Sequence, residues 1–179
     1  FSNEAGMGST PHAHAIAKVR HPGEQGLAAL VGLFVDTFIV LNMTAFVILT
    51  TGVLDGKTTG ISLTQKAFEV GLGPIGNGFV AVCLLFFAFT TIIGWYFFGE
   101  KNVKYLFSKH TNLATKIYAA LVVVFIIVGS TLKVNLVWNL SDLFNNLMVI
   151  PNVLGLWALS GTAKELYEDW KKQAPAKVK

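Results

Sequence analysis

The sequence predicts an all-α polytopic membrane protein. Hydrophobic residues make up 53% of its 179 residues and charged residues 13%, about half the charged share of a soluble domain. The charges are also unevenly spread, so that four long stretches contain a single charged residue, Asp36. A helix needs about 20 apolar residues to cross a bilayer. No basic region followed by a small-residue cleavage site precedes these stretches, so none resembles a signal peptide.

We expect transmembrane helices at residues 25–52, 78–99, 113–134 and 138–162. The third uncharged run is short, but Lys116 and Lys133 can extend it by snorkelling. In the first span, Asp36 lies about ten residues inside the helix and must face other helices or water. A place in a polar network and a place on a proton path are both open for this carboxylate.

Lys and Arg predict the orientation of these helices. Eleven of them lie before the first span, between the second and third spans, or after the fourth, and three lie on the opposite side. The richer side is expected to be cytoplasmic, which gives a cytoplasmic loop at 100–112 and a cytoplasmic tail at 163–179. We expect this tail to be a solvated end that touches the anionic leaflet. The membrane is expected to be a plasma membrane, specifically a bacterial inner membrane. No basic face of a soluble module is present, so no nucleic-acid partner is expected.

Residues 1–24 predict a broken helix. We expect residues 1–8 to be unwound and residues 9–19 to form a half-helix of about three turns. Non-helical chain at membrane depth is tolerated where it is buried or lines a cavity, so this segment predicts a solute site. Carbonyl groups of the unwound part could bind a hard cation, and the start of the half-helix could attract an anionic group. The alternative is a re-entrant loop packed against protein.

Glu4 lies in this unwound part. A carboxylate at this depth is unfavourable unless it is paired. It could bind a cation directly or brace the loop by accepting backbone N–H groups, and we favour the brace. The chain begins without Met, so we expect it to be the back part of a longer protein.

Residues 53–77 form an unusually long loop on the outer side. Glycines break it at both ends, and SLTQKAFEV between them can form a short helix capped by Ser62. Long loops of this kind are usually functional or disordered. We favour a lid over a vestibule, and a passive surface loop is the alternative.

The second span contains polar residues with helical spacing. Thr91 and Trp95 are four residues apart, so they lie on one face of the helix. The hydroxyls of Thr90 and Thr91 can offer oxygen to a small hard cation, while Trp95 can form the wall of an apolar pocket. The alternative is that the threonines bond back to the helix and bind nothing else.

The fourth span carries a polar stripe and a proline. Asn139, Asp142 and Asn146 lie on its outer half, and Pro151 is expected to kink its middle. Asp142 could close a gate by pairing with a basic residue elsewhere, or it could simply lie at the membrane interface. Cys83 is alone in an apolar span and is expected to be a structural filler.

The histidines before the first span predict no metal centre. His12 and His14 are two residues apart, which directs them to different faces of a helix. We expect them, with His21, to be interfacial.

Four blocks of the sequence carry a resemblance to a known family. They are FSNEAGMGSTPHAHA, HPGEQGL, TTIIGWYFFGEKNVKYLF and SDLFNNLMVIPNVLGL, and in this order they resemble the C-terminal part of the alanine or glycine:cation symporter family. The resemblance implies a LeuT-type fold with two inverted repeats. The chain would then supply the inner half of broken helix 6 and helices 7–10, and the missing N-terminal helices would belong to the same protein.

The resemblance also implies site residues. Thr91 and Trp95 would line the amino-acid site, and Thr90 or Thr91 would offer its hydroxyl oxygen to sodium. Residues Phe1, Ser2 and Asn3 would border the substrate.

The expected function is sodium-coupled symport of small neutral amino acids such as alanine or glycine, by alternating access. Proton coupling is an alternative, as is, less favoured, a channel or pore subunit. An enzyme is not expected, because the spans contain no nucleophile with a base and no metal pair.

Overall fold

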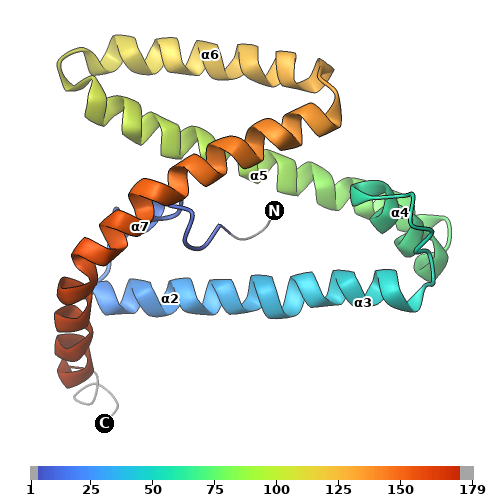
Figure 1. Ribbon diagram of the computed structural model, residues 1–179, viewed down its shortest axis with the longest axis horizontal. Coiled ribbons are helices and arrows are strands. Elements are labelled where there is room, and N and C mark those ends of the chain that lie inside the picture. Colours follow the sequence, from blue (N-terminus) through green and yellow to red (C-terminus); the bar gives the residue numbers. More distant parts are fainter. Residues whose placement is uncertain (1–3, 174–179) are drawn as a thin grey trace. The chain divides into compact units, whose positions relative to one another are not determined.

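The computed structural model describes residues 4–173, and its regular elements in this range are helices (Figure 1). The chain divides into two compact units. One contains residues up to 30 and from 95 onward, and the other contains residues 31–94. The boundaries fall inside two long helices, and each unit is described by itself below.

The first span is continuous but changes its helix type. It consists of α2 (Pro22–Phe34), the π-helix η1 (Val35–Leu41) and α3 (Asn42–Thr50). The sequence analysis did not predict the π-helix, which contains Asp36. Two side chains of α3 donate to carbonyls in this segment, Asn42 to Phe38 and Thr44 to Val40, each at 3.0 Å. Short π-segments within α-helices occur frequently at functional sites.

The outer loop contains a helix that is longer than expected. α4 (Gly60–Leu72) follows Thr59, whose backbone is extended. The expected cap at Ser62 is therefore wrong, because Ser62 already lies inside the first turn. α4 packs beside α3, and Phe68 stacks on Phe79 with 5.7 Å between ring centroids. Ala67 is completely buried at this packing surface.

The second and third spans are α5 (Ile75–Leu106) and α6 (Thr111–Thr131), joined by the short 3₁₀ helix η2 (Ser108–His110). α5 is longer at both ends than the expected 78–99. Within one unit, the last part of α5 lies close to α6. Tyr96 stacks on Tyr118 at 5.4 Å, and the hydroxyl of Tyr118 occupies the space that a side chain at Gly99 would need.

The fourth span is part of α7 (Val134–Gln173), which runs through Pro151. The expected tail from residue 163 begins as a continuation of α7, which extends to Gln173, and its residues up to there are mostly exposed. No Gly or Pro interrupts residues 163–173, so the helix continues. Trp170 lies against Gly23, and Asp169 Oδ2 is 3.3 Å from His21 Nε2. The end of α7 is therefore attached to the chain that enters α2.

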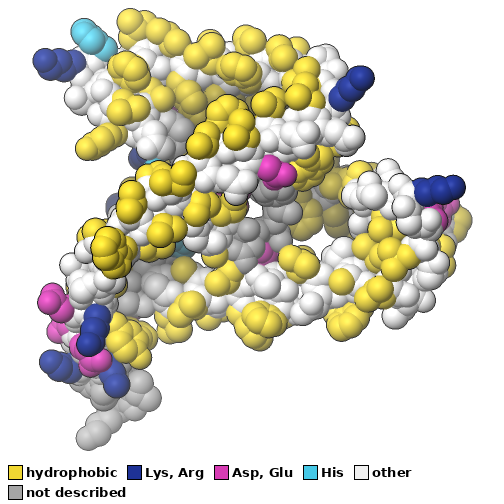
Figure 2. Space-filling view, viewed as in Figure 1, with side chains coloured by type: hydrophobic (Ala, Val, Ile, Leu, Met, Phe, Trp, Pro, Cys, Tyr) yellow, Lys and Arg dark blue, Asp and Glu magenta, His cyan; other side chains and the backbone are white. Residues whose placement is uncertain are grey.

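Within residues 4–173, four helical segments are long and apolar enough to cross a membrane, and they are Pro22–Thr50, Ile75–Leu106, Ser108–Thr131 and Val134–Gln173. Their most apolar stretches are almost entirely unburied. Figure 2 shows hydrophobic side chains along the helices. Such surfaces suit lipid or further helices. The chain is a multi-pass membrane protein.

Candidate functional site: a glycine segment joined to two helices

The half-helix expected at residues 9–19 is much shorter in the structure. α1 covers Pro11–His14, a single turn, and the backbone of Thr10 before it is already helical. A single turn is costly to nucleate and gains little without tertiary contacts. Such a short helix also lacks the aligned dipoles of a longer one. The expected anion site at its start is therefore withdrawn.

The chain before α1 is non-helical, as the sequence predicted. We call residues 4–9 the glycine segment. Gly6 and Gly8 have φ values of +82° and +101°, a region that residues with a side chain rarely adopt. The N–H of Met7 donates to the carbonyl of Glu4 at 3.0 Å. The segment therefore folds back on itself before the chain enters α1.

Glu4 has a partner inside the segment. Its carboxylate accepts a hydrogen bond from the hydroxyl of Ser9, and Ser9 is only 2% exposed. The sequence analysis considered backbone N–H groups as the partners of Glu4, whereas the structure gives it a side-chain hydroxyl. A carboxylate has acceptor capacity beyond one hydroxyl, so this contact leaves oxygen lone pairs for a second partner.

A second contact joins the glycine segment to α7. The side-chain amide of Asn152 donates from Nδ2 to the carbonyl of Gly6 at 2.8 Å. A Cβ built on Gly8 would lie 3.0 Å from the Cβ of Asn152. The sequence analysis missed Asn152. The available signal was an amide side chain directly after Pro151 inside an apolar span.

A third contact joins the segment to α5 through His12. His12 Nδ1 is 2.8 Å from the carbonyl of Ser9, and His12 Nε2 is 3.1 Å from Nδ2 of Asn102. Nε2 also lies 3.3 Å from Oδ1 of Asn102. A carbonyl can only accept, so the contact with Ser9 places a proton on Nδ1. His12 is therefore not simply interfacial, as we expected, because its ring connects α1 to α5.

The same contacts reach the expected pocket residue on α5. The ring of His12 lies 5.9 Å from that of Phe98, and Phe98 meets Trp95 edge-on at 6.0 Å. Trp95 is half-buried. Within one unit, the structure thus brings Glu4 and Trp95 into one connected set of contacts by way of Ser9, His12 and Phe98.

The other expected residues of α5 are two hydroxyls. Thr90 donates to the carbonyls of Phe86 at 2.9 Å and Phe87 at 3.2 Å. These bonds to the helix use the hydroxyl hydrogen and leave oxygen lone pairs. Thr90 can therefore either offer oxygen to a cation or bind nothing beyond its own helix. Thr91 is exposed, one helical turn before Trp95. The expected substrate residues Phe1, Ser2 and Asn3 lie outside the described residues.

The two remaining acidic candidates lie on separate helices. Asp36 is on η1, and its Oδ2 is shielded from solvent without a hydrogen-bond partner among residues 4–173. Asp142 is exposed on α7, and the expected gate pairing is not formed with any residue in the described range. Nor does that range hold a group of three or more His, Cys, Asp or Glu side chains placed to bind a metal.

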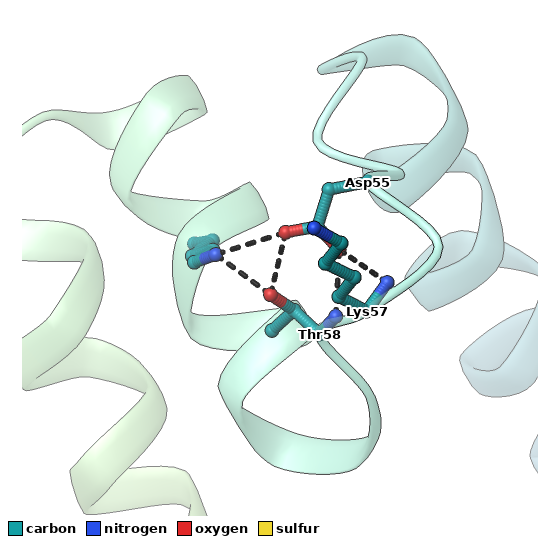
Figure 3. Close-up of polar contacts among 4 residues, drawn as sticks. Asp55, Lys57 and Thr58 are labelled. Atoms are coloured by element: carbon teal, nitrogen blue, oxygen red, sulfur yellow. Dashed lines mark hydrogen bonds and ion pairs between the residues drawn. The ribbon is translucent and has the colours of Figure 1, made fainter.

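The outer loop is held by its own carboxylate. Asp55 accepts from the N–H groups of Lys57 at 2.8 Å and Thr58 at 2.6 Å, and from the hydroxyl of Thr58 at 2.6 Å (Figure 3). Lys66 of α4 approaches the same carboxylate at 3.2 Å. The hydroxyl of Thr58, followed by the two N–H groups, holds the pKa of Asp55 well below its ordinary range.

Membrane-spanning helices beside a non-helical, glycine-rich segment are typical of helical membrane transporters. The family model described as the sodium:alanine symporter family matches residues 1–179, and the chain belongs to this family. The family and the relatives named below are transporters rather than enzymes.

Three relatives illustrate the similarity. The chain is 40% identical over 173 residues to the amino-acid carrier protein AlsT of Bacillus subtilis, and this match covers 97% of the chain and 37% of that relative. It is 42% identical over 165 residues to the sodium/alanine symporter AgcS of Methanococcus maripaludis, covering 90% and 36%. It is 40% identical over 177 residues to the probable sodium/glutamine symporter GlnT of Bacillus subtilis, covering 98% and 37%. The chain thus spans little more than a third of the length of these relatives. No solved structure matches it.

Proposed function

We propose that the full-length protein containing this chain is a sodium-coupled symporter of small neutral amino acids such as alanine or glycine. Membership of the sodium:alanine symporter family supports this proposal, as do the printed names of relatives that are about 40% identical. The observation that carries it is the glycine segment. It is non-helical and is joined by side chains to α7 at Gly6 and to α5 at Ser9.

We propose a LeuT-type arrangement for the whole protein. The chain would be its C-terminal part, with residues 1–24 as the unwound middle and inner end of broken helix 6. The four spans would be helices 7–10, and residues 53–77 would be the outer lid. The distribution of Lys and Arg supports a cytoplasmic C-terminus. The membrane that we propose is a plasma membrane, specifically a bacterial inner membrane.

The proposed amino-acid site is bordered by Thr91 and Trp95 of α5 and by residues 1–3 of the chain. Sodium would be a co-substrate that takes oxygen from Thr90 or Thr91 and from backbone carbonyls. Hydroxyl and carbonyl oxygens are suitable donors for a small hard cation. Glu4 would brace the glycine segment through Ser9, while Asp36 and Asp142 would serve in a polar network or a gate.

The proposed mechanism is alternating access. Sodium and the amino acid would order the broken helices, and one group of helices would then rock against the other around a site near the middle of the membrane. Coupling requires sodium to bind the substrate-competent state more tightly than the alternative state. A sodium ion that bound both states equally would shift neither.

The test is uptake into proteoliposomes by the full-length protein. Radiolabelled alanine and glycine are followed under an inward sodium gradient, with potassium as the control and unlabelled glutamine as a competitor. We expect Thr91→Ala to raise the half-activating sodium concentration at least about tenfold, since a lost ligand to a charged group is worth about 1.5–3 kcal/mol. Thr91→Ser should restore most of the activity, and Cys83→Ala should change nothing.

Other results of this uptake experiment would count against the cation site, the substrate class or the size of the pocket. Equal losses from Thr91→Ala and Cys83→Ala would contradict the assigned cation site. No uptake of either amino acid under any gradient would contradict the proposed substrate class. Strong competition by glutamine would indicate a larger pocket than alanine requires.

Proton coupling is the second candidate, and Asp36 is the observation that favours it. One of its oxygens is shielded from solvent and has no partner within the described range, and it lies on a π-helix. Uptake driven by a pH gradient without sodium, and abolished by Asp36→Asn, would support proton coupling. Unchanged sodium-driven uptake by Asp36→Asn would exclude this role.

A further inference from the structure

Asn152 lies in the fourth span, and its side-chain amide contacts the glycine segment. We propose that Asn152 is a positioning residue that holds the carbonyl of Gly6 and thereby keeps the glycine segment ready to bind the amino acid and sodium. This inference rests on the proposed function. The contact that carries it is the 2.8 Å hydrogen bond from Asn152 Nδ2 to the carbonyl of Gly6.

The glycine segment needs an external anchor. The bonds within it, from Met7 to Glu4 and from Ser9 to Glu4, close the turn but attach it to no helix. Glycines have more backbone states than other residues, so ordering them requires compensating contacts. Asn152 supplies one anchor at Gly6, and His12 supplies a second at the carbonyl of Ser9. The two anchors lead to different helices, α7 and α5.

The two surfaces at the first anchor fit each other closely. A Cβ on Gly8 would lie 3.0 Å from the Cβ of Asn152, which is tighter than ordinary van der Waals contact. The missing side chain at Gly8 therefore allows Asn152 to reach Gly6. Asn152 of α7 thus bonds to the carbonyl of Gly6 and packs against the open side of Gly8.

Pro151 lies directly before the anchor. Proline has no N–H, so the turn of α7 at residue 151 lacks one backbone hydrogen bond and bends more easily than its neighbours. A change in α7 at this turn would reach Gly6 through the next residue. The geometry therefore makes Asn152 the route by which the fourth span and the glycine segment influence each other.

A positioning role predicts a specific kinetic signature. If losing the anchor lowers the population of the binding-competent segment, every ligand that needs this segment loses apparent affinity by the same factor. The half-saturating concentrations of amino acid and sodium should then rise together, while the maximal rate per protein copy stays the same. A direct ligand would change one of these concentrations alone. A purely structural residue would lower the amount of folded protein or the maximal rate.

The variant Asn152→Leu tests this in the full-length protein, because leucine has no donor. We expect both half-saturating concentrations to rise about tenfold, which corresponds to about 1.4 kcal/mol, with a maximal rate within about twofold of the wild type. Asn152→Gln, which keeps the amide donor, should recover part of the affinity. Asn135→Leu is the matched control, since Asn135 lies on the same helix and is exposed. Unchanged concentrations in Asn152→Leu, a rise in only one of them, or an equal rise in Asn135→Leu would overturn the inference.

A second measurement does not depend on transport. Hydrogen–deuterium exchange of residues 4–9 in the detergent-purified protein should be about tenfold faster in Asn152→Ala than in the wild type. Equal exchange would overturn the inference. If the wild-type protein took up no amino acid, the proposed function would fail, and exchange alone would decide whether Asn152 holds the segment.

Discussion

The glycine segment and the outer loop before α4 are built from similar parts but are held in different ways. Each interrupts helical structure, contains glycines with positive φ, and has a carboxylate that accepts a nearby hydroxyl, Ser9 to Glu4 or Thr58 to Asp55. The described partners of Asp55 all lie within 11 residues of it in the sequence. The anchor of Gly6 comes from Asn152, 146 residues away.

This difference separates two kinds of irregular structure. The described partners of Asp55 are near it in the sequence, so we expect the loop before α4 to change conformation with little effect on the membrane-spanning helices. The glycine segment depends on contacts with α5 and α7, so its conformation changes when those helices change. A segment of the second kind is suited to couple ligand binding to helix movement, which supports placing the solute site there rather than in the outer loop.

The largest expected effect is that of Gly8→Ala. Alanine at φ +101° is strained by about 1–3 kcal/mol, and its Cβ would also press on Asn152 at 3.0 Å. We expect uptake to fall about a hundredfold or more and thermal unfolding in detergent to shift to lower temperature. Gly6→Ala is the matched control, because φ there is +82° but, apart from its chain neighbours, no described residue has an atom within 4 Å of the added Cβ. Its loss should be about tenfold, and equal losses would contradict the close contact with Asn152.

The next effect concerns the internal bond of the glycine segment. Ser9→Ala removes the hydroxyl that donates to the partly exposed Glu4 carboxylate from a buried position, which should destabilise the protein by about 0.5–1.5 kcal/mol. Thermal unfolding should show this loss, and Ser9→Ala combined with Glu4→Gln should show less of it. Ser130→Ala is the control, because Ser130 is exposed and its hydroxyl donates to the carbonyl of Ile127 in its own helix. A Ser130→Ala loss as large as that of Ser9→Ala would show that the contact with Glu4 is unimportant.

A smaller and local effect is expected from Asp55→Ala. The loop loses the acceptor for four donors, the two N–H groups, the hydroxyl of Thr58 and the ammonium group of Lys66, so trypsin should cleave after Lys57 several times faster. Uptake should stay within about twofold, because the helices and the glycine segment keep their contacts. Abolished uptake in Asp55→Ala would show that the outer loop is not independent of the site.

The pH dependence of the outer loop follows from the same carboxylate. The pKa of Asp55 is lowered in the folded loop, so its contribution is complete above the ordinary carboxyl pKa of about 3.9. That contribution decreases as the pH falls through this value toward the lower pKa of the folded state. Hydrogen exchange of residues 55–58, corrected for intrinsic rates, should show constant protection from pH 8 to 5. A loss of protection between pH 7 and 6 would contradict this assignment.

The smallest effect is expected from Lys66→Met. The ion pair between Lys66 and Asp55 measures 3.2 Å, but the two side chains are 52% and 42% exposed, and exposed ion pairs contribute little to stability because water screens them. Trypsin cleavage after Lys57 should rise less than twofold. A rise as large as that of Asp55→Ala would show that Lys66, rather than the N–H groups and Thr58, holds the loop.

Much of the fold follows from the sequence because its causes are local. Uncharged runs of sufficient length predicted the four spans, and the structure contains four helices that overlap them. Glycines at residues 6 and 8 predicted a break before the first span, and the structure has one there. The half-helix at 9–19 and the cap at Ser62 were wrong, because helix propensity decides neither where a short helix ends nor which residue precedes its first turn.

Only the tertiary structure decided what holds the glycine segment. Asn152 and His12 are ordinary polar residues in the sequence, and nothing in their spacing shows that they contact Gly6, Ser9 and Asn102. The end of α7 is similar, since its contact with His21 and Gly23 depends on packing across almost the whole chain. The sequence by itself determined the membrane spans and the position of the break, because apolar length and glycine act locally. Side-chain contacts across 90 and 146 residues decided how the glycine segment is held, because a hydrogen bond depends on distances that only the packed helices define.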